Sequence, residues 1–346
     1  MVSPKPITIV GGGLAGLTLG IGLRRRGVPV TIWEAGHYPR HRVCGEFISG
    51  RGQETLARLD LRELLDRAGA TLAQTAAFCS ATVAGRARKL PQPALCLPRN
   101  QMDALLAARF RELDGELREG ERCRDTTDRE GIVFASGRRL QPVVNGWRWF
   151  GLKTHAVGVA MRADLEMHVF ANGYVGLCRQ PGGIVNVCGL FRRKPATDAA
   201  ANWQEDLRGA AGSLLRQQMG AATFVADSFC AVAGINLNPQ RARRQSECSI
   251  GDALTMIPPI TGNGMSMAFE SAEMAIAPVA AWSCGDIPWT QTQQILARQC
   301  DAAFGRRLAW SRWLQAMMFA PGLQSVLIGF ASSNEWFWRT LFARTR

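Results

Sequence analysis

The residues with the clearest chemical meaning are three glycines near the N-terminus and one glutamate beyond them. Gly11, Gly13 and Gly16 form a Gly-x-Gly-x-x-Gly pattern, and Glu34 follows 18 residues after Gly16. The first glycine of such a pattern permits a tight turn, the second lets the backbone approach a pyrophosphate, and the third lets helix and strand pack closely. An acid placed like Glu34 accepts hydrogen bonds from an adenosine ribose. The pattern predicts a dinucleotide site, at which we also expect Leu14, Ala15 and Ala35.

A second glycine-rich segment lies far downstream. Gly251-Asp252-Ala253 is followed by Pro258-Pro259-Ile260-Thr261-Gly262-Asn263-Gly264-Met265. Gly262 and Gly264 allow a ligand to approach the backbone closely. A helix that begins near Asn263 would point free N–H groups at that ligand and stabilise negative charge on it. Taken alone, the segment also fits a loop that caps a core helix.

The elements that must position the first glycines follow from the hydrophobic periodicity. The apolar run at 7–10 predicts a buried strand, and the pattern at 15–26 predicts a packed helix that ends at Gly27. Residues 28–33 predict a second, β-branched strand. A strand, a helix and a strand in this order form one β-α-β unit, which implies a parallel sheet.

The pattern changes further along the chain. Helical stretches at 52–68 and 100–113 flank a strand-like stretch at 76–90. Between 150 and 237, several short apolar runs predict an antiparallel sheet. The hairpin turns of that sheet are expected at Asn172-Gly173 and Gly182-Gly183.

Together, the two glycine segments resemble those of the FAD-dependent flavoprotein superfamily that includes aromatic hydroxylases and geranylgeranyl reductases. Smaller matches support this resemblance: Arg42-Val43-Cys44-Gly45-Glu46 with Ser49, Arg99 with Asp103 and Leu106, and Trp149-Phe150-Gly151-Leu152-Lys153. The resemblance implies FAD as the cofactor, with Arg42, Cys44, Gly45 and Arg99 beside it. It also implies that Gly251 and Asp252 contact the ribityl or pyrophosphate part, and that Gly262, Asn263, Gly264 and Met265 reach the isoalloxazine edge.

The fold class that we expect is α/β, with a FAD-binding Rossmann-like domain, an inserted antiparallel β-sheet substrate domain and a helical C-terminus. The FAD-binding domain is expected to be discontinuous, because its two glycine segments lie on either side of the predicted antiparallel sheet. The expected ranges are 1–75, 96–147 and 245–285 for the FAD-binding domain, 76–95 and 148–244 for the substrate sheet, and 286–346 for the C-terminal helices.

The chain departs from the superfamily at one place. Members usually carry a Gly-Ala-Asp-Gly segment whose Asp-Gly helps to bind both FAD and NAD(P)H. Here the strand-like Val143-Val144 continues into Asn145-Gly146 and then directly to Trp147. The departure leaves the electron donor open between NAD(P)H and a separate reductase.

The candidate catalytic residues are Glu46, His155 and Lys153. Glu46 and His155 are ionisable groups expected near the flavin ring, and Lys153 could hold an anionic substrate. The alternative is structural, because a single His or Lys in a sheet more often serves the fold. Cys44 is either a redox-active thiol or a buried, inert cysteine.

The leading functional prediction is a flavin monooxygenase that hydroxylates an aromatic or lipophilic, polyketide-like metabolite. A reductase of isoprenoid-type double bonds is the first alternative, favoured by Cys44-Gly45-Glu46. A flavin-dependent halogenase is a more distant one, because the sequence has no Trp-x-Trp-x-Ile-Pro segment. A degenerate, non-catalytic flavoprotein is the alternative from another class, and the departure near Asn145 motivates it.

Composition restricts the partners. The net charge of +13 comes from short, scattered arginine groups, which disfavours nucleic acid as a partner. The ten cysteines show no C-x-x-C spacing, so we expect no metal site, no disulfide framework and a cytoplasmic location. At the C-terminus, apolar residues with helical spacing and an arginine rim, between 306 and 346, fit peripheral contact with an anionic membrane. The same pattern is equally typical of helices that pack on the FAD domain or at a dimer interface.

Overall fold

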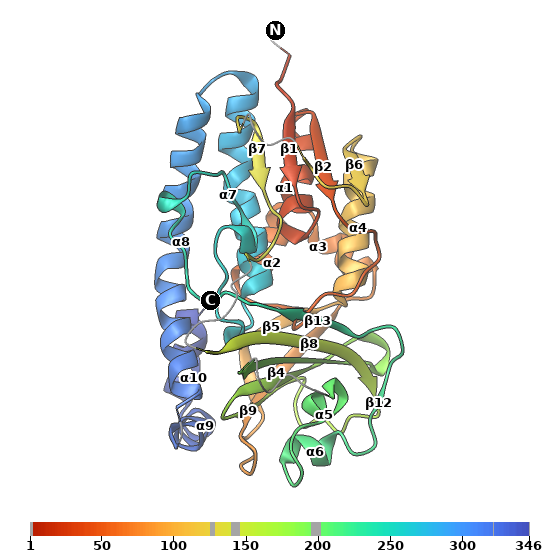
Figure 1. Ribbon diagram of the computed structural model, residues 1–346, viewed down its shortest axis with the longest axis vertical. Helices are drawn as coiled ribbons and strands as arrows, with labels where there is room; N and C mark the ends of the chain where they lie inside the picture. The colour runs from red at the N-terminus through yellow and green to blue at the C-terminus, as the bar shows by residue number, and fades with distance from the viewer. Residues whose placement is uncertain (1–2, 125–128, 140–145, 195–201, 321, 346) are drawn as a thin grey trace.

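The computed structural model describes residues 3–124, 129–139, 146–194, 202–320 and 322–345. The molecule is elongated, with a small parallel sheet toward one end and a large sheet toward the other (Figure 1). Helices α7 (Gly264–Cys284) and α8 (Trp289–Met318) run lengthwise along one side. The departure predicted at Val143, Val144 and Asn145 lies outside the described residues.

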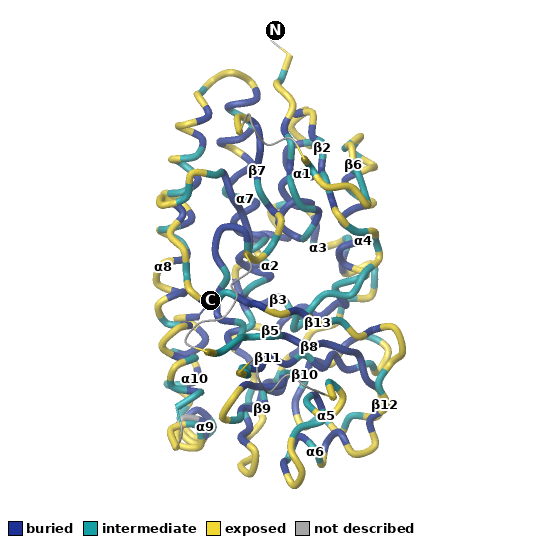
Figure 2. The backbone as a smooth tube through the Cα atoms, in the orientation of Figure 1, coloured by how far each residue is buried: buried dark blue, intermediate teal, exposed yellow. Residues whose placement is uncertain are grey.

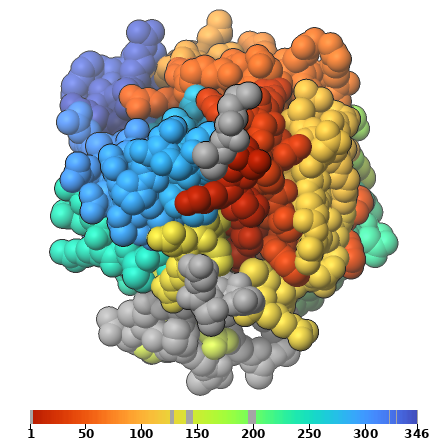
Figure 3. Space-filling model, turned by 90° about the horizontal axis from the view of Figure 1, so that it is seen from above, coloured from red at the N-terminus to blue at the C-terminus, as the bar shows by residue number. Residues whose placement is uncertain are grey.

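The small sheet has the strand order β6-β2-β1-β7, and its strand pairs are parallel. Its strands are β1 (Ile7–Val10), β2 (Val30–Glu34), β6 (Glu116–Glu119) and β7 (Ile132–Phe134). Helix α1 (Leu14–Arg24) connects β1 to β2, so the predicted β-α-β unit is present, with ends within two residues of those predicted. Figure 3 looks onto this end of the molecule, where the N-terminal segment (red) meets the end of α7 through a bond from Lys5 N to Ser283 O.

The core of this domain lies between the parallel sheet and three helices. Helix α1 is buried from Leu14 to Leu23 and packs against α4 (Arg99–Glu112) and α7. A helix without an exposed face must be covered on every side, which explains why its sequence is apolar all round. The chain therefore uses α7, from its C-terminal third, to complete a core that its first residues begin.

The large sheet has the order β12-β8-β11-β10-β9-β4-β5-β3, with β13 also paired to β8. All of its pairs are antiparallel except β4 with β9. Its strands are β3 (Phe47–Ile48), β4 (Thr71–Cys79), β5 (Arg88–Cys96), β8 (Arg148–Val157), β9 (Leu165–Phe170), β10 (Gly173–Arg179), β11 (Val185–Arg193), β12 (Thr223–Phe224) and β13 (Cys230–Ala233). The turns predicted at Asn172-Gly173 and Gly182-Gly183 connect β9 to β10 and β10 to β11. The expected α/β fold class is confirmed.

Two local predictions need correction. The strand-like stretch at 76–90 is not continuous, because it contains the end of β4 and the start of β5, which form a hairpin. Pro91 and Pro93 lie inside β5, and proline weakens the sequence signal of a strand. The helix expected at 52–68 is divided into α2 (Arg51–Arg58) and α3 (Arg62–Arg67), because Asp60 adopts a left-handed backbone conformation with a φ of 48°.

Helices cover both faces of the large sheet (Figure 2). The short helices α5 (Trp203–Arg208) and α6 (Leu214–Gln218) pack on one face, away from the parallel sheet. Helices α9 (Leu323–Ser333) and α10 (Glu335–Thr345) pack against the β4–β5 side. Among the described residues, no single helix has the length and apolar character to cross a membrane; α8 and α9 satisfy the criterion only jointly, with a bend of 117° between them.

Candidate functional site

The three N-terminal glycines lie in two different environments. A Cβ on Gly16 would lie 2.0 Å from the backbone oxygen of Gly11, and one on Gly11 would lie 2.3 Å from that of Ala135. A Cβ on Gly13 would meet nothing within 4 Å. Gly11 and Gly16 therefore serve close packing, whereas Gly13 faces open space at the start of α1. No side chain caps that helix and no acid lies in its first turn, so its N–H groups are available to an anion.

Glu34 ends β2 beside this turn and is buried. Its carboxylate accepts hydrogen bonds from the backbone N–H groups of Gly12 and Gly36, each at 2.9 Å, and it pairs with Arg40 and Arg42. The hydroxyl of Tyr38 donates to the Gly12 oxygen and covers the outer side of the turn. A ribose at this position would therefore share Glu34 with donors of the protein itself. Ala35, the neighbour of Glu34, is exposed.

Three arginines and two aspartates gather beyond the first turn of α1. Asp103 is fully buried and pairs with Arg99 at 3.0 Å and with Arg42 at 3.3 Å. Burial raises the pKa of Asp252, and the charges of Arg99 and Arg138 act against that shift. With Arg40 and Glu34 included, four guanidinium groups face three carboxylates, and this positive excess suits a diphosphate. Arg138 was missed by the sequence analysis, although it follows strand β7 at the edge of the sheet where ligands bind in such folds.

The second glycine segment packs directly on the first. Gly251, in the short helix η4 (Gly251–Ala253), lies so close to Ala15 that a Cβ would be 2.9 Å from that of Ala15. After η5 (Pro259–Thr261), Gly262 has a left-handed φ of 63° and lies against the ring of Phe47. The tertiary fold thus places the two predicted cofactor segments side by side.

The amino end of α7 has features of a ligand site. Asn263 is buried and its amide donates to the backbone oxygen of Thr345 at 2.6 Å, but its Oδ1 has no hydrogen-bond partner. A Cβ on Gly264 would meet only Ile257, at 4.0 Å. An unpartnered buried oxygen fits a bound group that donates a hydrogen bond, such as a ring N–H. Met265, the next residue, is buried in the core.

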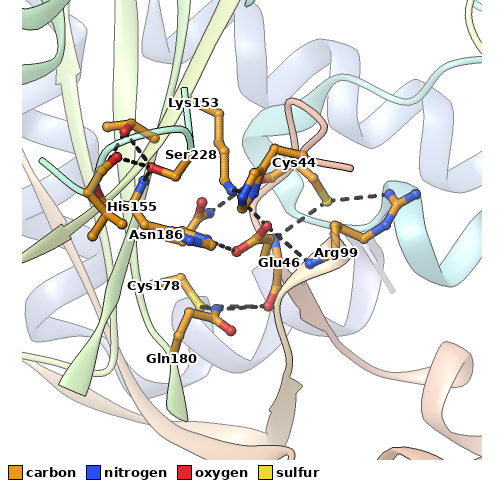
Figure 4. Close-up of polar contacts among 12 residues, drawn as sticks. Cys44, Glu46, Arg99, Lys153, His155, Cys178, Gln180, Asn186 and Ser228 are labelled. Atoms are coloured by element: carbon orange, nitrogen blue, oxygen red, sulfur yellow. Dashed lines mark hydrogen bonds and ion pairs between the residues drawn. The ribbon is translucent and has the colours of Figure 1, made fainter. Parts of the chain in front are cut away.

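A second charged cluster lies between the two sheets (Figure 4). Glu46 has a left-handed φ of 59° and is fully buried. Its Oε1 accepts from Lys153 Nζ and from the backbone N–H of Arg99, both at 3.1 Å, and its Oε2 lies 2.7 Å from His155 Nε2. Glu46 is therefore in direct contact with both of the other predicted catalytic residues, Lys153 and His155.

Strand geometry explains why Lys153 and His155 point to the same place. They are two residues apart on β8, so their side chains share the face of the sheet that looks toward Glu46. The hydroxyl of Ser228 accepts from the backbone N–H of His155 at 2.9 Å and holds the strand. His41, which the sequence analysis did not select, accepts a hydrogen bond from Lys153 at Nδ1, at 3.0 Å.

The loop that carries Glu46 is anchored to the large sheet through its backbone. Asn186 donates to the Cys44 oxygen at 2.9 Å, and Gln180 donates to the Glu46 oxygen at 3.1 Å. The Cys44 thiol lies 3.8 Å from an Arg99 guanidinium nitrogen. Burial nevertheless raises the pKa of Cys44, so the thiol form prevails at neutral pH and the inert interpretation is favoured. Gly45 is half-buried beside the ring of Phe47.

The electrostatics of the cluster are balanced internally. Burial alone would raise the pKa of Glu46, but the hydrogen bond with His155 and the charge of Lys153 outweigh it, and the pKa is lowered. Burial and the charge of Lys153 lower the pKa of His41 to about 4, so His41 is neutral at pH 7. His41, Glu46 and His155 have the spacing of metal ligands. The Lys153 ammonium, within 3.1 Å of both His41 and Glu46, already supplies a cation there.

Another buried group, on the opposite face of the large sheet, also has metal-ligand spacing. It consists of Cys79, Glu166 and His168. One oxygen of Glu166 accepts from the backbone of Arg162 and Ala163, and the other from His168 and Gln218. Four hydrogen bonds saturate this carboxylate, which indicates that it orders the loop before β9.

Comparison with known proteins places this arrangement in a class of folds. A family model described as NAD(P)-binding Rossmann-like domain matches residues 9–48. No curated protein matches the chain by sequence. Solved structures match nearly the whole chain in fold but have low sequence identity to it, as three examples show.

The flavin-dependent brominase Bmp2 has a TM-score of 0.75 at 16% identity, covering 99% of this chain and 93% of the brominase. The p-nitrophenol 4-monooxygenase PnpA from Pseudomonas putida has a TM-score of 0.75 at 13% identity, with 99% and 98% covered. A geranylgeranyl bacteriochlorophyll reductase-like protein from Thermoplasma acidophilum has a TM-score of 0.72 at 16% identity, with 95% and 92% covered. The chain therefore has the fold shared by flavoprotein monooxygenases, reductases and halogenases, as its sequence predicted.

Proposed function

We propose that this chain is a FAD-dependent oxidoreductase that hydroxylates an aromatic or other lipophilic metabolite. The observation that carries the proposal is the double role of Arg99. Its guanidinium belongs to the positive cluster that suits a diphosphate, while its backbone N–H donates to Glu46 in the charged cluster between the sheets. Arg99 would thereby link the proposed cofactor site to the charged cluster around Glu46. The fold neighbours, whose titles name a brominase, a monooxygenase and a reductase-like protein, support flavin chemistry.

The residues present fit FAD. The free end of α1 at Gly13 and the guanidinium groups of Arg42, Arg99 and Arg138 would hold the diphosphate, and the amino end of α7 at Asn263 would meet the ring. When bound and reduced, FAD supplies the electrons and the oxygen activation that hydroxylation requires. One oxygen atom of O2 would enter a C–H bond and the other would leave as water. This requires two electrons, from a nicotinamide or a separate reductase, and two protons.

The contribution of the chain itself is to hold charge beside the substrate. The ammonium of Lys153, fixed by Glu46 and His41, would stabilise an ionised hydroxyl on an aromatic substrate, and such a group activates the ring toward an electrophilic oxygen. Neutral His41, which is only partly buried, would help to position the Lys153 ammonium through its Nδ1. His155 holds Glu46 in place.

The first test is an absorbance spectrum of the purified protein, before and after incubation with FAD. NADPH and NADH are then added without oxygen, and finally air is admitted with a panel of phenolic and lipophilic compounds. Bleaching, followed by incorporation of oxygen from labelled O2 into a product, is expected. A yellow protein that ignores both nicotinamides requires a separate reductase. A protein that stays colourless with FAD contradicts every flavoenzyme proposal and favours a non-catalytic role.

A reductase of isoprenoid-type double bonds is the second candidate. The segment Cys44-Gly45-Glu46 that motivates it is clamped between the two domains, with Asn186 and Gln180 on its backbone oxygens. Product formation under strictly anaerobic conditions would favour this reaction over hydroxylation. Halogenation would instead require both oxygen and a halide, so omission of bromide and chloride separates it from the other two.

A further inference from the structure

The outward face of helices α9 and α10 is apolar. Leu323, Val326 and Phe330 follow one another at helical spacing on α9, with 42%, 67% and 48% of their surfaces exposed. Trp336, at the start of α10, is 73% exposed. Single exposed apolar residues are ordinary on a protein surface, but four on two adjoining helices form a patch that favours a partner.

The orientation of these helices is fixed by their other face. Ile328, Ala331, Trp338 and Phe342 are buried, and the last three pack on apolar residues of the large sheet. The indole of Trp338 donates to the Lys89 oxygen at 2.9 Å, and Arg88 donates to the Ala331 and Ser332 oxygens. The apolar side chains on the outer face are therefore held at the surface by packing beneath them. Figure 2 shows α9 as largely exposed at one end of the molecule.

The charge around the patch is mainly positive, although Arg339 pairs with Glu335 at 2.9 Å. From residue 302 to the end, the sequence has six arginines and a single acidic residue, Glu335. Arg312, Arg339 and Arg344 are exposed on α8 and α10. Arg307 is buried with Glu270 and does not contribute to the surface. Arginine and tryptophan around an apolar patch match the interface of a bilayer, where acyl chains adjoin anionic headgroups.

We propose that this α9–α10 face, formed by Leu323, Val326, Phe330 and Trp336 with its arginine rim, docks on an anionic lipid bilayer. Charge complementarity favours this occupant over a second copy of the chain. A two-fold contact through the same face would bring the arginine rims together, with Glu335 as the single acid of this segment to offset them. The proposal does not depend on the reaction that the protein catalyses.

Sedimentation of the full chain with vesicles tests the proposal. Binding is measured with phosphatidylcholine alone and with about 30% phosphatidylglycerol added, at low and high salt, because an anionic surface attracts arginines in a salt-dependent way. The double variant Val326→Asp/Trp336→Asp should reduce binding to the anionic vesicles at least about tenfold. Arg312→Gln/Arg339→Gln should weaken binding and reduce its salt dependence.

Val157→Asp is the matched control. Val157 is 43% exposed at the end of β8, on another part of the surface, and its replacement should leave vesicle binding unchanged. A blue shift of tryptophan fluorescence on anionic vesicles, absent in Trp336→Phe, would place this side chain in lipid. The proposal is overturned if the Val326→Asp/Trp336→Asp protein is folded by circular dichroism and still binds like the wild type. It is also overturned if the wild-type protein does not bind the anionic vesicles and instead forms a dimer that this variant disrupts.

Discussion

The glycine turn and the Glu46 cluster are built by different means. At the turn, the important groups belong to the backbone. The essential property of Gly11, Gly13 and Gly16 is the absence of a side chain. In the cluster, the important groups are charged side chains from the loop at 41–46 and from strand β8, joined by one backbone N–H from the start of α4. The first region depends on space and the second on compensated charge. They should therefore respond differently to substitution.

The largest effect is expected in the charged cluster. Lys153→Met keeps the volume of a side chain that is fully buried but leaves Glu46 with less compensation. Removing one partner of a buried ion pair costs about 3–5 kcal/mol. We expect a loss of that order in the free energy of unfolding, measured with urea.

A double variant makes this prediction sharper. Adding Glu46→Gln to Lys153→Met removes the uncompensated charge, so part of the lost stability should return, about 1–3 kcal/mol. Equal stability of the single and double variants would mean that the pair does not act through charge.

At the glycine turn, the effect of a side chain should depend on the position. Gly16→Val would place a Cβ against the backbone oxygen of Gly11, which cannot move aside, and should cost about 3 kcal/mol of stability. Thermal unfolding of the protein without cofactor measures this loss. A Gly16→Val protein as stable as the wild type would contradict the close packing.

Gly13→Asp should lower the affinity for FAD and leave the stability of the fold nearly unchanged. The new side chain enters open space and can cap α1, so stability should change by less than about 0.5 kcal/mol. Its carboxylate would repel a diphosphate, and FAD affinity should fall on the order of a hundredfold, about 2.7 kcal/mol. Fluorescence titration with FAD measures the affinity of the variant and the wild type. Unchanged affinity would count against a diphosphate at this turn.

Arg138 offers a smaller test of the positive cluster. Arg138→Gln removes a charge near Asp252 and Arg42. FAD affinity should fall about tenfold, the value of one charge-assisted hydrogen bond. Arg139→Gln, at the neighbouring position, is the matched control and should leave affinity unchanged, because Arg139 bonds to Ala253, Gln245 and Glu247.

The smallest effect concerns pH. The pKa of His41 is lowered from 6.5 to about 4, so between these values the unfolded chain binds a proton that the folded chain does not. Stability should therefore decline as the pH falls from about 6.5 toward 4 and be insensitive to His41 above that window. Urea unfolding at several pH values should show a shallower decline for His41→Gln. An identical pH dependence in the two proteins would contradict the shifted pKa.

Much of the fold could be predicted where the pattern is local. The β1-α1-β2 unit, both hairpin turns and the helical C-terminus follow from short stretches of sequence. The β4–β5 hairpin and the break at Asp60 could not be predicted, because Pro91 and Pro93 obscure a strand and a left-handed aspartate has no strong local signal. The site was likewise predicted only in part. Glu46, Lys153 and His155 were selected singly, whereas Arg138 and His41 were missed.

By itself, the sequence determined the glycine turn, because a tight bend beside a helix requires residues without side chains at a set spacing. It also determined the alternation that makes Lys153 and His155 share a face of β8. Only the tertiary structure decided that Glu46 meets both of them, that Gly251 packs on Ala15, and that α9 and α10 turn an apolar face outward. These contacts join segments that are far apart in the chain. They depend on how the sheets and helices pack, which no local spacing encodes.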